Sequence, residues 1–198
     1  MSAASAWLRK VLVGALCAVT CALTLANPLR ADGQKDPALK ELLQKVIGKA
    51  DCFSDKYEAI VWYKAMEPRL QRFVNSHQLR IEILDHVYCE AKRDAGVKLP
   101  PDLVLALIEV ESRFDPWAVS HAGAVGLMQV MPFWPRELGV QNQLVRVAPN
   151  IRMGCEILRF YLRKEHGDWA RALARYNGSL GRTTYSSAVM SRWRAWRF

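Results

Sequence analysis

The sequence predicts a mainly α-helical protein with at most a small β-hairpin. Apolar residues recur at helical spacing over 37–49 and again over 78–95, so each stretch predicts an amphipathic helix. A third stretch, 100–112, is apolar on nearly every side, which is typical of a helix buried in the core. A glycine-punctuated segment over 113–129 follows and predicts a loop, the one place suited to a hairpin.

The core helix and its two carboxylates organise the rest of the chain. Pro101 in the first turn and Asp102 near the positive end of the helix dipole indicate a start at this point. The apolar run over 103–110 is interrupted at Glu109, and Glu111 follows it directly. A helix turns by about 100° per residue, so these two carboxylates point roughly 200° apart and do not form a close pair.

Glu111 is the better candidate for catalysis. It lies on the stripe formed by Val104, Leu107 and Ile108, and it directly precedes the loop. Its carboxyl is therefore expected to have apolar neighbours on the helix side and to be accessible from the loop side. Such surroundings raise the pKa of a glutamic acid and suit it to act as a general acid. Spacing alone leaves a second interpretation open, in which the carboxylate pairs with an arginine at the helix end.

Four motifs follow one another in order over about 99–181. They are Glu111-Ser112, then the segment 123–129 reading GAVGLMQ, then Asn150-Ile151 with Gly154, and finally 174–178 reading ARYNG. Together they resemble the lytic transglycosylase domain of the soluble-transglycosylase (SLT, family 1) type, a relative of goose-type lysozyme. An arginine stands in the last motif where the family has none, at a position without an assigned role. The resemblance implies a lysozyme-like domain.

The resemblance also implies a chemistry. Glu111 would protonate the oxygen between N-acetylmuramic acid and N-acetylglucosamine in peptidoglycan. It would then accept the proton of the muramyl C6 hydroxyl, giving 1,6-anhydromuramyl ends without water, as a carbon–oxygen lyase. Tyr176 would donate a hydrogen bond to Glu111, and the other expected substrate-binding residues are Ser120, Met128, Gln129 and Asn177. For Met128 a purely core position is the stronger alternative.

Two other functional classes stay open. A lysozyme-like hydrolase would cut the same bond with water and, as glycosidases do, would use a second carboxylate. Asp115 is the nearest in the matched motifs, and its place before Pro116 favours a loop-capping role instead. A non-catalytic wall-binding or secretion-assembly protein would keep the cleft without turnover. The presence of Glu111 argues against that class.

The N-terminus predicts export. Residues 1–26 combine Arg9 and Lys10 with an apolar run and small residues at a cleavage site, which is typical of a signal peptide. An uncleaved anchor or lipidation at Cys21 is less favoured. Residues 27–36 predict a flexible leader. With no repeat or low-complexity linker, the helices of 37–98 are expected to pack on the catalytic domain of 99–198, which ends in a helix.

The net charge and the cysteine content limit which binding partners and cofactors are expected. The formal net charge of +9 suits an acidic polymer or surface. Export excludes nucleic acid and favours peptidoglycan in the periplasm or outside the cell, with a position at a membrane or secretion complex left open. The scattered His and Cys residues disfavour a metal, no cofactor is expected, and a monomer is the default. Cys155 is expected to be buried, which leaves a Cys52–Cys89 disulfide.

Overall fold

The computed structural model describes Pro37 and residues 56–197, all within residues 31–198, the larger of the two units of the chain. The predicted signal peptide, the leader and nearly all of the helix expected over 37–49 lie outside the described residues, as does Cys52. The expected boundary between 37–98 and 99–198 therefore stays a prediction.

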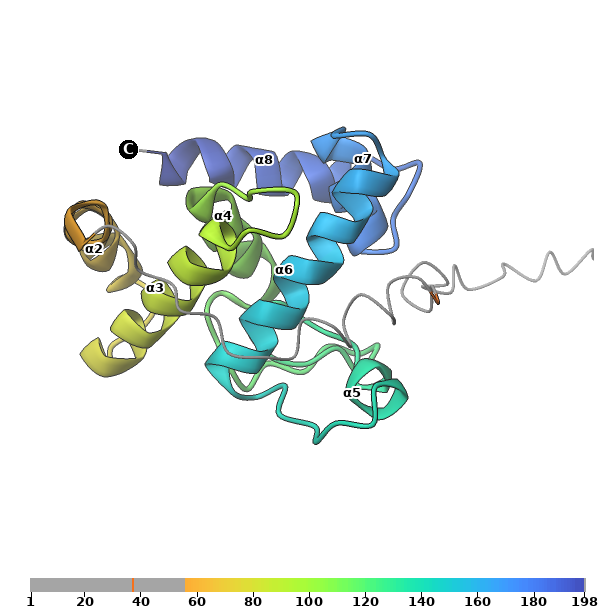
Figure 1. Ribbon diagram of the computed structural model, residues 1–198, viewed down its shortest axis with the longest axis horizontal. Helices are drawn as coiled ribbons and strands as arrows, with labels where there is room; N and C mark the ends of the chain where they lie inside the picture. The colour runs from red at the N-terminus through yellow and green to blue at the C-terminus, as the bar shows by residue number, and fades with distance from the viewer. Residues whose placement is uncertain (1–36, 38–55, 198) are drawn as a thin grey trace, which may run out of the picture. The chain divides into compact units, whose positions relative to one another are not determined.

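Seven helices account for the regular structure of the described residues (Figure 1). They are α2 (Lys56–Leu70), α3 (His77–Lys92), α4 (Pro101–Ser112), α5 (Phe133–Glu137), α6 (Val147–Lys164), α7 (Trp169–Tyr176) and α8 (Thr184–Trp196). The loop after α4 contains two isolated antiparallel bridges, Val119–Val125 and Val125–Val130, and no longer strand among the described residues. The prediction of a mainly α fold is confirmed.

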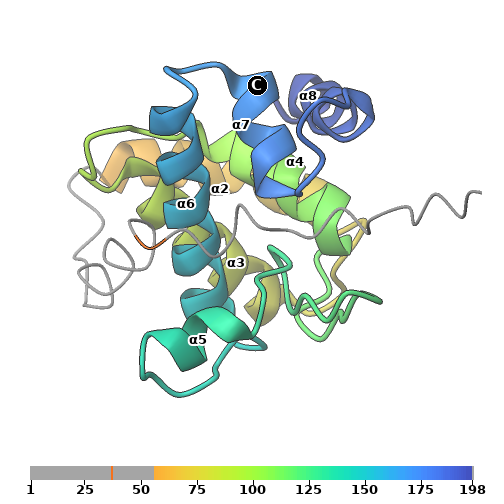
Figure 2. The same ribbon diagram turned by 90° about the vertical axis from the view of Figure 1, so that its right-hand side faces the viewer.

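Helix α4 lies in the core, as its apolar sequence predicts. Its residues Leu103 to Ile108 are fully buried, and it packs between α3 and α8 (Figures 1 and 2). Helix α8 carries the aromatic C-terminal sequence, and its Trp196 is buried in the same core. The C-terminal helix therefore docks into the fold through Trp196.

The N-terminal helices pack on the rest of the fold, because α3 contacts both α4 and α6. Helix α2 includes Pro68 and ends at Leu70. Pro68 stands in the last turn. Because proline has no backbone N–H, one hydrogen bond is missing there, close to the end of the helix. Helix α3 ends at Lys92 and not near Ala95, so Gly96 lies beyond its cap.

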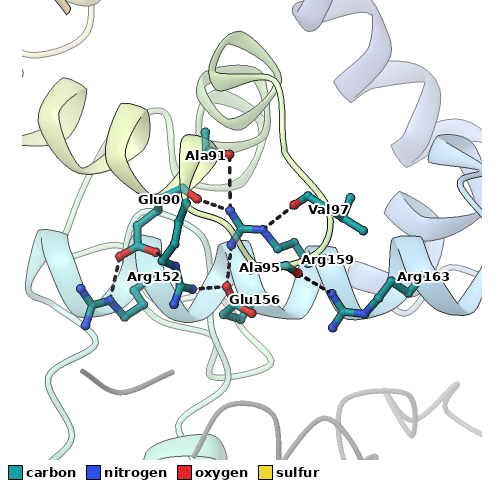
Figure 3. A network of polar contacts seen from close by, with 9 residues as sticks. Glu90, Ala91, Ala95, Val97, Arg152, Glu156, Arg159 and Arg163 are labelled. Atoms are coloured by element: carbon teal, nitrogen blue, oxygen red, sulfur yellow. Dashed lines mark hydrogen bonds and ion pairs between the residues drawn. The ribbon is translucent and has the colours of Figure 1, made fainter. Parts of the chain in front are cut away.

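A buried ionic network joins α3 to α6 (Figure 3). The Nε of Arg152 donates to Oε1 of Glu90 at 2.7 Å, and Nη1 of Arg159 donates to Oε1 of Glu156 at 2.5 Å. Arg159 also donates to the Val97 carbonyl at 2.9 Å. Glu90 on α3 thus forms an ion pair with Arg152 on α6. Buried charges need such partners, so the network fixes the relative positions of the two helices.

The cysteines follow the expected division. Cys155 is buried on α6 with a free thiol, and Cys89 on α3 is disulfide-bonded. The partner of Cys89 lies outside the described residues, so its pairing with Cys52 stays a prediction. Within the part of the chain that the structure describes, none of the helices combines the length and the apolar character that a membrane span requires.

Candidate active site

The last turn of α4 presents Glu111 beside the loop. The helix ends because Arg113 adopts a left-handed conformation, with φ of 52° and its N–H donating to the Glu109 carbonyl at 3.1 Å. The neighbouring Ser112 hydroxyl donates to the Leu127 carbonyl at 2.8 Å. Within the Glu-Ser pair of the motif, Glu111 is the candidate acid. Ser112 joins the end of the helix to the segment that contains Met128 and Gln129.

Glu111 itself is half-buried, and its Oε1 accepts a hydrogen bond from the hydroxyl of Tyr185 on α8. Burial removes water from the carboxylate and raises its pKa to about 7, while the Tyr185 hydrogen bond acts in the opposite direction and lowers it. At neutral pH both protonation states are therefore populated. The carboxyl can donate a proton in one step and accept one in the next.

The loop facing Glu111 is held by Asn150 on α6. Its Oδ1 accepts from the Met128 N–H at 2.7 Å, and its Nδ2 donates to the carbonyls of Val125 at 2.9 Å and Leu144 at 2.8 Å. Asn150 lies inside α6, which begins at Val147. The partners of its side chain all lie outside this helix, so the bonds tie the helix to the loop.

Met128 has its side chain in the hydrophobic core. Its side chain is 0% exposed and packs on Gly154 of α6, where an added Cβ would lie 2.6 Å from the Met128 Sδ. The absence of a side chain at Gly154 provides the space that the thioether fills. The expected substrate contact of Met128 is thus replaced by a packing role beneath the loop, in line with the alternative interpretation.

Tyr176 also differs from its expected role. It is buried at the end of α7, and its hydroxyl donates to the Met128 carbonyl at 2.7 Å and not to Glu111. The pKa of Tyr176 is well above its ordinary value, first because of burial and then because of the nearby Glu111 charge. Tyr176 therefore lies close enough to feel the carboxylate, while Tyr185 supplies the hydrogen bond.

The remaining predicted residues lie on the loop and at the end of α7. Gln129 has a φ of 49°, and its Nε2 donates to the carbonyls of Gly126 and Ala118 at 2.9 and 3.1 Å. The Ser120 hydroxyl accepts from the Ala124 N–H at 3.0 Å and closes the turn of the bridged loop. Asn177 is exposed just after α7. Each has a local structural role or an open surface, and substrate contact by these residues stays a prediction.

The carboxylates nearest in sequence to Glu111 have other partners. Asp115 caps the loop by accepting from the Trp117 N–H at 2.9 Å, as its place before Pro116 predicts. Glu109 accepts from the Trp196 Nε1 at 2.8 Å. Among the described residues there is no group of three or more His, Cys, Asp or Glu side chains that could hold a metal. Glu111 is thus the candidate acid of the site.

Sequence reasoning missed Tyr185 and the loop-holding role of Asn150. Tyr185 lies in the first turn of α8, 74 residues after the carboxylate that it contacts, and outside every motif that was used. Its only sequence signal is a tyrosine at the start of an amphipathic C-terminal helix. The two residues meet because α8 packs across α4.

The chain is similar to several known proteins. The family model of the transglycosylase SLT domain matches residues 89–190. A transglycosylase of Enterobacteria phage PRD1 is 35% identical over 97 residues, covering 49% of this chain and 36% of that protein. The membrane-bound lytic murein transglycosylase C of Actinobacillus pleuropneumoniae is 59% identical over 34 residues, covering 17% of this chain and 9% of that protein.

Among solved structures, an inactive mutant of the lytic transglycosylase Slt from Pseudomonas aeruginosa matches 71% of this chain and 28% of its own, with 22% identity and a TM-score of 0.48. Each match covers only part of the related protein, between 9% and 36% of its length. The described residues form a mainly α-helical domain with the Glu111 carboxyl in the last turn of α4. The match over residues 89–190 shows that the chain belongs to the transglycosylase SLT domain family.

Proposed function

We propose that the chain is a peptidoglycan lytic transglycosylase that cleaves the β-1,4 bond between N-acetylmuramic acid and N-acetylglucosamine without water. The observation that carries the proposal is the state of Glu111. Its carboxyl is half-buried, has a pKa of about 7 and accepts a hydrogen bond from Tyr185. Such a group is protonated often enough to act as an acid and ionised often enough to act as a base.

In the first step Glu111 would protonate the glycosidic oxygen as the bond to the muramyl C1 breaks. In the second step the resulting carboxylate would accept the proton of the C6 hydroxyl while that oxygen bonds to C1, which closes the 1,6-anhydro ring. The carboxyl ends the cycle protonated, so one acid serves both steps. The positions of Glu109 and Asp115, each engaged elsewhere, support a mechanism with one carboxylate.

Tyr185 would act as a positioning residue. Its hydroxyl holds Glu111 in one orientation and stabilises the carboxylate formed after the first proton transfer. Asn150 and Tyr176 would keep the loop with Gln129 in place, since both bond the backbone of Met128. Ser120, Gln129 and Asn177 are the residues that we expect to contact sugar.

The cellular setting follows from this function. We infer an extracytoplasmic role in cell-wall remodelling, in the periplasm or after secretion, with residues 1–26 as the export signal and Cys21 unmodified. The basic charge of the chain suits a polymer that bears carboxylates. The working model is a monomer, free or peripheral to a membrane or secretion complex.

Mass spectrometry of the products from purified sacculi tests the proposal. The protein should release anhydromuropeptides, and Glu111→Gln should reduce release at least about 100-fold, the usual contribution of a general acid. Reducing-end muropeptides would instead make the protein a hydrolase. Binding to sacculi with no product from either protein would indicate a wall-binding module.

A further inference from the structure

The ends of α2, α4 and α8 meet around three aromatic side chains. Ring centroids lie 5.2 Å apart for Phe73 and Phe114, 5.7 Å for Phe114 and Trp196, and 6.3 Å for Phe73 and Trp196. Phe114 and Trp196 are buried, and Phe73 is half-buried. The three rings thus pack against one another at the junction of these helix ends.

Four arginines lie on or next to these helix ends, and we call them the arginine cluster: Arg69, Arg72, Arg113 and Arg197. The guanidinium carbons of Arg72 and Arg113 lie 5.9 and 5.8 Å from the centroid of the same ring, Phe73. Arg69 donates through Nη1 to the Trp196 carbonyl at 3.0 Å, and Arg197 lies 4.5 Å from the Trp193 centroid. Stacking on aromatic rings orients the planar guanidinium groups in advance of binding.

The positive charge of the arginine cluster is not compensated locally. Within the described part of the chain, none of its four arginines forms an ion pair. The nearest carboxylates bind other groups, because Glu109 pairs with Arg192 at 3.3 Å and Glu67 pairs with Arg80 at 2.7 Å. Arg72, Arg113 and Arg197 are exposed. Guanidinium groups in this state bind carboxylates or phosphates with matching geometry.

The arginine cluster is linked to the candidate catalytic residue by two helices. On α4, Arg113 follows Glu111 by two residues. On α8, Tyr185 contacts Glu111 while Trp196 contacts Glu109, and the eleven-residue separation of these two side chains corresponds to about 16 Å along a helix. A peptide of about four residues extends to about 13 Å. A peptide attached to a sugar near Glu111 would therefore reach the long side chains of the arginines.

We propose that the arginine cluster binds the carboxylates of the peptide stems that peptidoglycan strands carry, and so favours peptide-bearing glycan over bare glycan. The inference rests on the proposed function for the identity of the polymer. An anionic membrane is the weaker partner, because interfacial helices insert exposed aromatic or aliphatic residues. The large exposed apolar residues described here are Val61, Trp117, Val119, Val145 and Leu180, none of which belongs to α8.

A binding experiment without turnover tests the proposal. The Glu111→Gln protein is mixed with intact glycan strands, or with strands stripped of peptides by an amidase, and the bound fraction is measured by sedimentation. We expect about tenfold tighter binding to the peptide-bearing strands at low salt, the sum of several exposed ion pairs. Adding Arg72→Gln and Arg113→Gln should remove this preference, as should high salt.

Two further variants make the result specific. Arg136→Gln with Arg163→Gln removes the same charge from exposed residues on α5 and α6 and should keep the preference. Arg72→Gln with Arg197→Gln leaves the end of α4 untouched and should reduce it, so misfolding at Arg113 cannot explain a loss.

Three results would overturn the proposal. They are a preference that survives in the cluster variants, one that the control pair loses equally, and cluster-dependent binding to phosphatidylglycerol vesicles in place of glycan. Failure of the wild-type protein to release anhydromuropeptides would refute only the proposed chemistry, because this assay reads binding.

Discussion

The hydroxyl of Tyr185 donates a hydrogen bond to Oε1 of Glu111, joining the first turn of α8 to the last turn of α4. The bond opposes the effect of burial, which alone would raise the pKa of Glu111 further. Burial also raises the pKa of Tyr185 well above its ordinary value, with the Glu111 charge as the next cause, so the phenol remains a hydrogen-bond donor at neutral pH. The pair thus sets the proton affinity of the candidate acid.

Replacing Tyr185 with phenylalanine should shift the pH dependence of the reaction. A hydrogen bond to a charged group contributes about 1.5–3 kcal/mol, so its loss should raise the pKa of Glu111 by about one unit or more. The alkaline limb of the pH profile reports loss of the acidic proton, and it should move to higher pH. Anhydromuropeptide release measured from pH 5 to pH 9 provides the profile.

A fall in rate at all pH values with the same profile would contradict this assignment and indicate a purely structural tyrosine. Tyr63→Phe is a matched control, because its hydroxyl also donates to a carboxylate, Asp85 at 2.6 Å, on the outer helices α2 and α3. That variant should leave the profile unchanged.

Glu111→Gln should stabilise the fold at alkaline pH. The pKa of Glu111 rises from about 4.5 to about 7 on folding, so the folded state holds a proton that the unfolded state releases between these values. Stability relative to a neutral residue is unchanged below pH 4.5 and falls as the pH rises, by about 3 kcal/mol once it passes 7. The variant lacks this penalty.

Urea denaturation of both proteins at pH 4.5 and pH 8.5 measures the effect. The difference in the free energy of unfolding should favour the variant at pH 8.5 and be near zero at pH 4.5. An equal difference at both pH values would show that Glu111 ionises in the folded state as readily as in the unfolded chain.

How far the sequence predicts this molecule depends on the range of each interaction. The apolar run over 103–110 predicts α4 and its burial, and the position of Glu111 behind that run predicts its raised pKa, because both effects are local. The partners of Glu111 and Met128 are not predicted, since Tyr185 and Asn150 reach them from 74 and 22 residues away. Which of two tyrosines bonds Glu111 depends on the crossing of α7 and α8, which no motif encodes.

Asn150→Ala should destabilise the fold and weaken the site together. The change leaves the Met128 N–H and the carbonyls of Val125 and Leu144 without their partner in a buried region. An unsatisfied buried polar group costs about 1–3 kcal/mol, so we expect a total loss of about 3 kcal/mol, allowing for partial relaxation. Denaturant unfolding measures it, and anhydromuropeptide release at a temperature where the variant is folded should fall as well.

Asn142→Ala is the control, because Asn142 is exposed and its Oδ1 accepts one bond, from the Leu144 N–H at 3.3 Å. Its loss should be less than about 0.5 kcal/mol. Similar losses in the two variants would mean that the Asn150 bonds are replaced by water.

Alanine substitutions at Gly123 and Gly126 distinguish the cost of backbone strain from the cost of a steric clash, because the two glycines lie in one loop. Both have positive φ, 80° and 83°, so alanine is strained at either position. An added Cβ at Gly123 meets nothing within 4 Å, whereas at Gly126 it would lie 2.3 Å from the Leu144 carbonyl oxygen and 2.5 Å from the Asn150 Nδ2. Gly123→Ala should therefore reduce stability by about 1 kcal/mol.

Gly126→Ala should reduce stability by about 2 kcal/mol more than Gly123→Ala, the usual effect of overpacking. It should also displace Asn150, whose bonds hold Met128 beside the candidate acid, and so lower the rate. Unfolding curves and product release for the two variants, measured side by side, provide the comparison. Equal losses in stability would show that the chain at 144 moves aside freely, and would remove the close packing of this loop on α6 as the reason for a glycine at 126.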